Sequence, residues 1–287
     1  MNESQVTPNK ASSWRVGTQK HRETLSSPAN ESFEFIDLFA GIGGMRIAFE
    51  SVGGSCVFSS EWDPAAAKTY EANFGEFPSG DITKIEADEI PYFDVLLAGF
   101  PCQPFSSIGK REGFLHATQG TLFNDVLRIV NSKKPRAFLL ENVKGLTTHD
   151  GGRTIRVILE ALEAEGYELH TNILDSSDYG LPQVRERIYI VGFLREIMQG
   201  SQDFLWPRKI TTKQVIGPFV ELGVTDRSIS THLQENYLFK KEDGRPQIIN
   251  PESKIQVKTL VSSYHKIQRL SGTFVADGPT GLRLQRQ

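Results

Sequence analysis

Short apolar runs alternate along the chain with segments in which apolar residues recur at helical spacing. The apolar run at 33–39 predicts a strand, and it leads directly into a glycine-rich turn. Apolar residues at spacings i, i+3, i+4 and i+7 then predict a helix over 45–52. Further strands are expected at 55–60, 94–99, 137–140, 167–174 and 187–194, and further helices at 64–73, 121–130 and 152–165. This order of elements predicts an α/β fold built on a nucleotide-binding type of sheet.

The pattern also divides the chain into three regions. Residues 1–32 are rich in Ser, Thr, Asn, Lys and Glu with few apolar anchors, so we expect a mobile tail. Residues 33–194 carry the alternating strands and helices and are expected to form one domain. From about Arg195 the period is lost, and residues 195–287 predict a small irregular lobe, with one further strand near 257–263.

Composition and charge narrow the class of protein. The chain has 287 residues with a net charge of −3, and its 38% hydrophobic content is that of an ordinary globular protein. Two cysteines make no disulfide framework, and without a signal peptide or long apolar run we expect a cytoplasmic protein and no membrane partner. After Phe193 the net charge is +5, from 14 Lys and Arg against 9 Asp and Glu, so a polyanion would meet this part. Chance imbalance on a solvated surface is the alternative.

The glycine turn is the first candidate binding site. Residues 40–44 (Ala-Gly-Ile-Gly-Gly) follow the first strand, where glycines let the backbone approach a ligand closely. Glu61 ends the second strand about 20 residues later, where such sheets hold the hydroxyls of a ribose. Trp62 can lie against an adenine, and Asp81 can accept from an adenine amino group. The alternatives are a turn without a ligand and two carboxylates that cap the following helical segments.

The second candidate site surrounds a cysteine. Cys102 stands between Pro101 and Pro104 at the end of an apolar strand, and the two prolines restrict the backbone there. A nucleophile needs such fixed placement, whereas a structural cysteine does not. The polar segment 107–119 that follows predicts a long active-site loop.

Charged residues at later strand ends complete this site. Glu141 ends a strand on the edge expected to carry Cys102, so it is a candidate acid or a structural carboxylate bonded to a nearby loop. Arg185 and Arg187 lie two apart on an extended segment and therefore on one side of it. They could hold an anion or a carbonyl oxygen, or they could be surface charges.

Seven stretches, taken in order, resemble the DNA (cytosine-5)-methyltransferase family, and the eight-residue form at 99–106 is similar to bacterial restriction-modification members. The resemblance covers about residues 33–194. The stretches are Asp37–Gly44, Glu61–Asp63, Gly80–Ile82, Gly99–Ser106, Gly120–Phe123, Glu141–Val143 and Gln183–Arg187.

The resemblance implies a fold, a reaction and a cofactor. The fold would be a Rossmann-like S-adenosylmethionine-dependent methyltransferase sheet with a target-recognition lobe. Cys102 would add to C6 of a cytosine, which turns the base into an enamine that can take a methyl group at C5. Glu141 would bond N3 and the exocyclic amine, and Arg187 with Arg185 would face O2. The base would be flipped out of a specific duplex DNA sequence.

The resemblance also assigns binding residues, and it implies no metal. S-adenosylmethionine would be held by Phe39, Ala40, Gly41, Ile42, Gly43, Gly44, Glu61, Trp62, Asp81, Ile82 and Pro101. The duplex would be contacted by Gln103, Ser106, Lys110, Arg111, Gln183, Tyr264 and Lys266, and the lobe at 195–287 would read sequence in the major groove.

Two late motifs of the family are missing, although residues 281–284 are similar to the approach to one of them. We therefore expect either a truncated enzyme or the larger part of an enzyme split over two polypeptides, with a second polypeptide as partner. Two other readings stay open at this point. One is an RNA cytosine-5 methyltransferase, and the other is a non-catalytic DNA-binding or regulatory relic.

Overall fold

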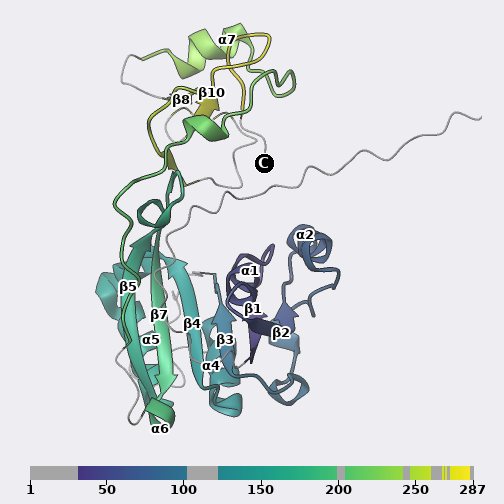
Figure 1. Cartoon of the computed structure of the whole chain (residues 1–287), viewed down its shortest axis with the longest axis vertical. Helices are drawn as coiled ribbons and strands as arrows, with labels where there is room; N and C mark the ends of the chain where they lie inside the picture. The colour runs from purple at the N-terminus through teal and green to yellow at the C-terminus, as the bar shows by residue number, and fades with distance from the viewer. Residues whose placement is uncertain are drawn as a thin grey trace, which may run out of the picture. The chain divides into compact units, whose positions relative to one another are not determined.

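A computed structural model describes residues 32–101, 122–198, 204–241, 246–259, 267, 269 and 272–284. Within these residues the main element is a six-stranded sheet with strand order β2-β1-β3-β4-β7-β5 (Figure 1). The first four of these strands run parallel to one another, and β7 runs antiparallel to both β4 and β5. The strands are β1 Phe33–Leu38, β2 Gly54–Ser60, β3 Val95–Ala98, β4 Ala137–Val143, β5 Tyr167–Asp175 and β7 Glu186–Leu194. The predicted α/β class and its strands are confirmed.

The predicted helices are also present, with one error at the first. They are α1 Gly44–Glu50, α2 Pro64–Phe74, α4 Leu122–Lys133 and α5 Arg153–Ala164. The prediction of helix up to Val52 is wrong, because the helix ends at Glu50 and Val52 lies in a turn with 67% of its surface exposed. Ala48, one of the apolar residues whose spacing predicted this helix, is exposed, whereas the charged Arg46 is buried.

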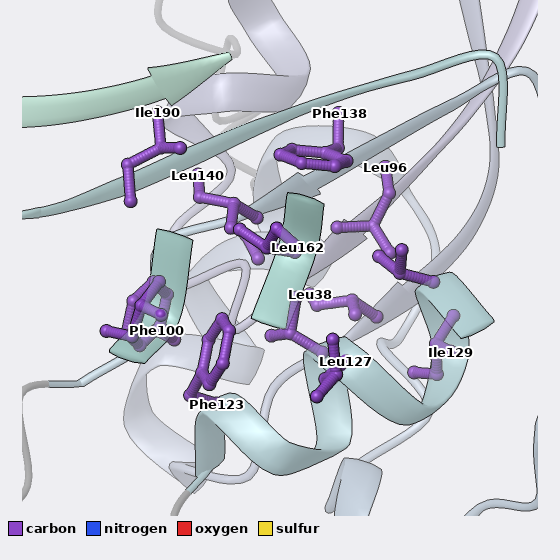
Figure 2. Close-up of a cluster of buried hydrophobic side chains, with 14 of the residues drawn as sticks. Leu38, Leu96, Phe100, Phe123, Leu127, Ile129, Phe138, Leu140, Leu162 and Ile190 are labelled. Carbon is purple, nitrogen blue, oxygen red and sulfur yellow. The ribbon is translucent and has the colours of Figure 1, made fainter. Parts of the chain in front are cut away.

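The main core lies where α4 and α5 pack on the sheet. Figure 2 shows Phe123 and Leu127 of α4 and Leu162 of α5 gathered against strand residues such as Leu140, all of them buried. The sequence forms α4 because its apolar residues recur at spacings of three and four, which places them on one face. Gly192 of β7 allows this packing, since a Cβ there would lie 2.1 Å from the ring of Phe138.

The described residues after Leu194 form short elements with small cores of their own. Ile229, Leu238, Phe274 and Leu282 make one of these cores. The expected strand near 257–263 begins as predicted in β9, Val257–Lys258, and residues 260–263 lie outside the described residues. The other short elements after Leu194 are α6 Arg195–Met198, η6 Gly217–Phe219, α7 Thr231–Leu233, η7 Gln234–Leu238, β8 Gln247–Ile249 and β10 Thr273–Val275. The short elements before Leu194 are η1 Ile82–Lys84, η2 Ala87–Glu89, η3 Lys144–Thr147, η4 His149–Gly152, η5 Ser176–Tyr179 and β6 Gln183–Val184.

One carboxylate ties this last region together. Asp277 accepts from the backbone N–H of Val224 at 3.1 Å and from Nε of Arg283 at 3.0 Å. The backbone of Gly278 also donates to Asp277, and this bond contributes most to the change in pKa. Together with the bonds from Arg283 and Val224, it lowers the pKa of Asp277 to about 2. Within the ranges given above, no helix is long and apolar enough to cross a membrane. The expected division at residues 32 and 194 stays a prediction.

Candidate active site

The glycine-rich turn after β1 adopts the backbone that its sequence requires. Gly41 and Gly43 have φ of 58° and 90°, where glycine carries no steric penalty. Phe39 has φ of 56° although it has a side chain, so the turn holds a non-glycine residue in the left-handed region. Such local strain is typical of sites where a ligand approaches the backbone.

The end of α2 supports this turn from behind. Asn73 donates from Nδ2 to the carbonyl oxygen of Ile42 at 2.9 Å. The ring of Phe74 lies against Gly43, where a Cβ would come within 2.1 Å of it. The guanidinium of Arg46 lies 4.3 Å from the centre of that ring, and it pairs with Glu50 at 2.6 Å. The residues at 42 and 43 are therefore held by α2 as well as by their own backbone.

Glu61 links the turn to the end of β2. Its side chain is 8% exposed, and its Oε2 accepts from the backbone N–H of Gly41 at 2.8 Å. Its Oε1 accepts from the backbone N–H of Asp63, also at 2.8 Å. The capping alternative fails for Glu61, because Asp63 is the residue that caps α2. Each carboxylate oxygen has a second lone pair, so Glu61 can still accept from two hydroxyls.

A cavity of about 160 Å³ opens beside this carboxylate. Five of the residues predicted to bind the cofactor line it: Phe39, Glu61, Trp62, Asp81 and Ile82. Four lining residues were missed, namely Ser60, Gly80, Thr83 and Leu122. Gly80 and Leu122 stand in motif stretches that could have indicated them. The other predicted residues at 40–44 and Pro101 are not among its lining residues.

The walls of the cavity suit an aromatic and polar ligand. The Trp62 side chain is 67% exposed, so the face of its ring is open to a partner. Asp81 caps η1, with its Oδ1 accepting from Oγ1 of Thr83 at 2.8 Å, and this bond lowers the pKa of Asp81. The capping alternative for Asp81 is thus confirmed, and its contact with an adenine stays a prediction for a residue that lines the cavity.

The second group of predicted residues meets at the end of β4. Nε of Arg187 lies 2.9 Å from Oε1 of Glu141, and Nη2 of Arg185 lies 3.9 Å from the same oxygen. The Glu141 and Arg187 side chains are only 19% and 15% exposed, so the surface-charge alternative is wrong for Arg187. Burial, followed by the repulsion of Arg187, lowers the pKa of Arg185. This arrangement holds one carboxylate in place with two positive charges beside it.

The same strand end contacts the chain that leads to Cys102. A Cβ built on Gly99 would lie 3.8 Å from Oε2 of Glu141, an ordinary contact distance, so the carboxylate lies next to the backbone at Gly99. Asn142, buried and not among the predicted site residues, donates from Nδ2 to the carbonyl oxygen of Phe100 at 2.9 Å. Asn142 stands in the motif stretch Glu141–Val143, which could have indicated it as a site residue.

Of the remaining predicted residues, only one lies in the described part of the chain. Gln183 lies in β6, which pairs with Val257 of β9. Cys102, Gln103, Ser106, Lys110, Arg111, Tyr264 and Lys266 lie outside the described residues.

A mainly parallel sheet with an antiparallel β7, a glycine turn after β1 and a carboxylate at the end of β2 are together typical of the S-adenosylmethionine-dependent methyltransferase fold. Solved structures with this fold include Dnmt2 of S. pombe, with a TM-score of 0.67 and 18% identity over 88% of this chain and 83% of that one. The sequence pattern described as C-5 cytosine-specific DNA methylase matches residues 33–284, and the chain belongs to that family. The resemblance inferred from the motifs is thus confirmed.

Two curated relatives are named as Type II methyltransferases. M.MspI of Moraxella sp is 52% identical over 283 residues, which are 99% of this chain and 66% of the relative. M.BsuFI of Bacillus subtilis is 59% identical over 251 residues, which are 87% of this chain and 61% of the relative. The chain therefore spans somewhat under two thirds of the length of these relatives. Since each relative is itself longer than the matched region, the comparisons do not support a second polypeptide.

Proposed function

We propose that this chain transfers a methyl group to C5 of a flipped-out cytosine in a specific duplex DNA sequence. The observation that carries the proposal is the placement of Glu141, a largely buried carboxylate held by Arg187 at 2.9 Å and lying beside Gly99. Three residues further along, Pro101 leads into Cys102. Addition to a pyrimidine ring requires a nucleophile and an acid, and we propose that Cys102 and Glu141 supply these two groups.

Each residue of this group has a proposed task. The Cys102 thiolate attacks C6, and the electron pair of the C5–C6 double bond becomes available at C5. Glu141 bonds N3 and the exocyclic amine of the base, which stabilises the charge that develops on the ring. Arg187 and Arg185 face the cytosine O2 and keep the Glu141 carboxylate in its orientation. Asn142 holds the backbone of Phe100, two residues before the nucleophile.

The cofactor that we propose is S-adenosylmethionine, which supplies the methyl group. The residues around the 160 Å³ cavity fit it, because Glu61 retains acceptor capacity for ribose hydroxyls and Trp62 offers an open ring face for adenine. Asp81 and Ile82 lie on the wall where the adenine edge would meet the protein. Phe39, which lines the same cavity, has a φ of 56° and leads into the turn at 40–44.

The DNA contacts remain proposals that rest on charge and family. The part after Phe193 carries a net charge of +5, which favours a polyanion, and the two relatives described above are named as Type II methyltransferases. We propose that residues 195–287 contribute the target-recognition region, with Gln183, Tyr264 and Lys266 among its contacts, and that Gln103, Ser106, Lys110 and Arg111 contact the flipped base and its surroundings.

The test is transfer of a labelled methyl group from S-adenosylmethionine to mixed-sequence duplex DNA by the full chain. We expect incorporation at cytosine C5 that the Cys102→Ser variant loses. Incorporation into tRNA and not into duplex DNA would favour the RNA methyltransferase. If the folded chain binds duplex DNA and transfers no methyl group to either substrate, it is the non-catalytic relic and the proposal is wrong.

A further inference from the structure

The loop between β5 and β7 carries one of the two arginines beside Glu141. It begins at Asp175, the last residue of β5, passes through η5 and β6, and reaches Arg185 immediately before β7. Asp175 has no part in the chemistry proposed above. Its side chain nevertheless makes the contacts that close this loop.

A single carboxylate oxygen bonds both ends of the loop. Oδ1 of Asp175 accepts from the backbone N–H of Ser177 and from the backbone N–H of Arg185, each at 3.0 Å. The neighbouring Ser176 adds a bond from its own backbone N–H to the carbonyl oxygen of Arg185 at 3.2 Å. Both polar backbone groups of Arg185 are therefore bonded to residues 175 and 176.

The middle of the loop is bonded to the segments that follow the sheet. The carboxylate of Asp178 lies 2.7 Å from Nζ of Lys209 and 3.2 Å from Nζ of Lys213. The Oγ1 of Thr259 donates to the carbonyl oxygen of Val184 at 2.9 Å. The loop is therefore bonded to these segments in its middle and to residues 175 and 176 at Arg185.

We propose that Asp175 is a positioning residue, which fixes the backbone of Arg185 so that its guanidinium stays beside Glu141. The side chain of Arg185 is 41% exposed and sits 3.9 Å from the carboxylate, so its place depends on its backbone more than on packing. Only the expected effect of Asp175 on catalysis rests on the proposed function. The placement of Arg185 can be measured without any turnover.

Three variants separate the role of Asp175 from general stability. Asp175→Ala removes the acceptor for both N–H groups, whereas Asp175→Asn keeps an Oδ1 that can accept from both. Asp178→Asn is the matched control, because it breaks the ion pairs to Lys209 and Lys213 in the same loop and leaves the bonds of Asp175 intact. Melting temperatures confirm that all three variants are folded under the conditions used.

Hydrogen exchange of the full chain, resolved at peptides covering 183–188, is the first measurement. We expect Asp175→Ala to speed exchange of the Arg185 amide by about tenfold or more, the loss expected for one net backbone bond. The Asn and Asp178→Asn variants should stay within about threefold of the parent chain, as should peptides of β1 in every variant. Unchanged exchange at Arg185 in Asp175→Ala would overturn the proposal.

Methyl transfer to duplex DNA is the second measurement. Asp175→Ala should lower kcat by about tenfold or more with little change in KM for DNA, and Asp175→Asn should restore most of it. An Asn variant as impaired as the Ala variant would show that the two backbone bonds are not what matters, and the proposal would fail. If the parent chain transfers no methyl group, the proposed function fails, and the exchange comparison still decides the role of Asp175.

Discussion

The side-chain amide of Asn142 donates to the backbone carbonyl of Phe100 across 2.9 Å, in a part of the protein where Asn142 is only 3% exposed. The bond joins the end of β4 to the segment that leads from β3 into Cys102. Because β3 and β4 are parallel neighbours, with Ala98 opposite Leu140, their carboxyl ends lie at one edge of the sheet. Asn142 is thus a fixed connection between the carboxylate of Glu141 and the approach to the proposed nucleophile.

Asn142→Ala should weaken both stability and activity. It leaves the Phe100 carbonyl without its donor, which costs about 1–3 kcal/mol of the free energy of unfolding when the group is buried. Urea denaturation measures this loss. Asn131→Ala is the control, since its bond to Glu165 is exposed and its removal should change stability by less than about 0.5 kcal/mol. Equal effects of the two substitutions would contradict the connection described here.

Glu141→Gln should lower kcat by about a hundredfold or more, because the amide carries no charge with which to stabilise the addition at C6. The measurement is steady-state methyl transfer to duplex DNA. Glu168→Gln on β5 removes a carboxylate that is half exposed and paired only with His170 in the described structure, and kcat should stay within about twofold. A Glu141→Gln enzyme with full kcat would remove this residue from the proposed chemistry.

Gly43→Ala should destabilise the fold by about 2 kcal/mol or more. The residue has φ of 90°, and its new Cβ would lie 2.1 Å from the ring of Phe74. Gly44→Ala is the matched control, because no atom lies within 4 Å of its Cβ position and it opens a helix. Alanine in place of glycine there should leave stability unchanged or raise it by up to about 1 kcal/mol. Thermal unfolding of the two variants would separate them, and a similar loss in both would refute the packing of Phe74 on the turn.

Asp37 should make stability fall as the pH rises from about 4 to about 7. Burial raises the pKa of this carboxyl from 3.8 to about 7, and the carboxyl is 1% exposed. Below pH 4 it is protonated in both the folded and unfolded states. Between the two pKa values the unfolded state loses the proton that the folded state keeps, so ionisation favours unfolding. The contribution reaches an upper limit of about 4 kcal/mol.

Urea denaturation of Asp37→Asn at pH 5 and pH 8 tests this. The variant should lack that part of the pH dependence and should be more stable than the parent chain at pH 8. Asp88→Asn alters an exposed carboxylate on η2 and should keep the slope of the parent chain. If Asp37→Asn kept the parent slope, the raised pKa would not belong to Asp37.

The strands were predictable because each one carries a run of apolar residues of the length typical of a strand, and turn residues mark the ends of these runs. The cavity residues Phe39, Glu61, Trp62 and Asp81 were predictable for a related reason, since strand ends and glycine turns are local in sequence. Leu122 was missed because it reaches the same cavity from a separate segment, at the start of α4.

Other features of the site depend on contacts between residues that are far apart in the sequence, and these could not be predicted. Arg187 meets Glu141 because β7 runs antiparallel to β4, with Val143 opposite Arg187, and no local pattern reveals that register. The burial of Arg46 in α1 depends on such distant contacts as well. It is buried because Tyr70 and Phe74 of α2 cover it and Glu50 and Glu76 pair with it.

The most direct test of the central claim is covalent trapping with duplex DNA that contains 5-fluorocytosine, in the presence of S-adenosylmethionine. The fluorine at C5 blocks the final elimination, so the adduct at C6 accumulates. Peptide mass spectrometry should find the methylated base attached to Cys102, in the parent chain and in Cys56→Ser, which changes the other cysteine of the sequence. A folded chain that binds the duplex and forms no adduct at Cys102 would contradict the account.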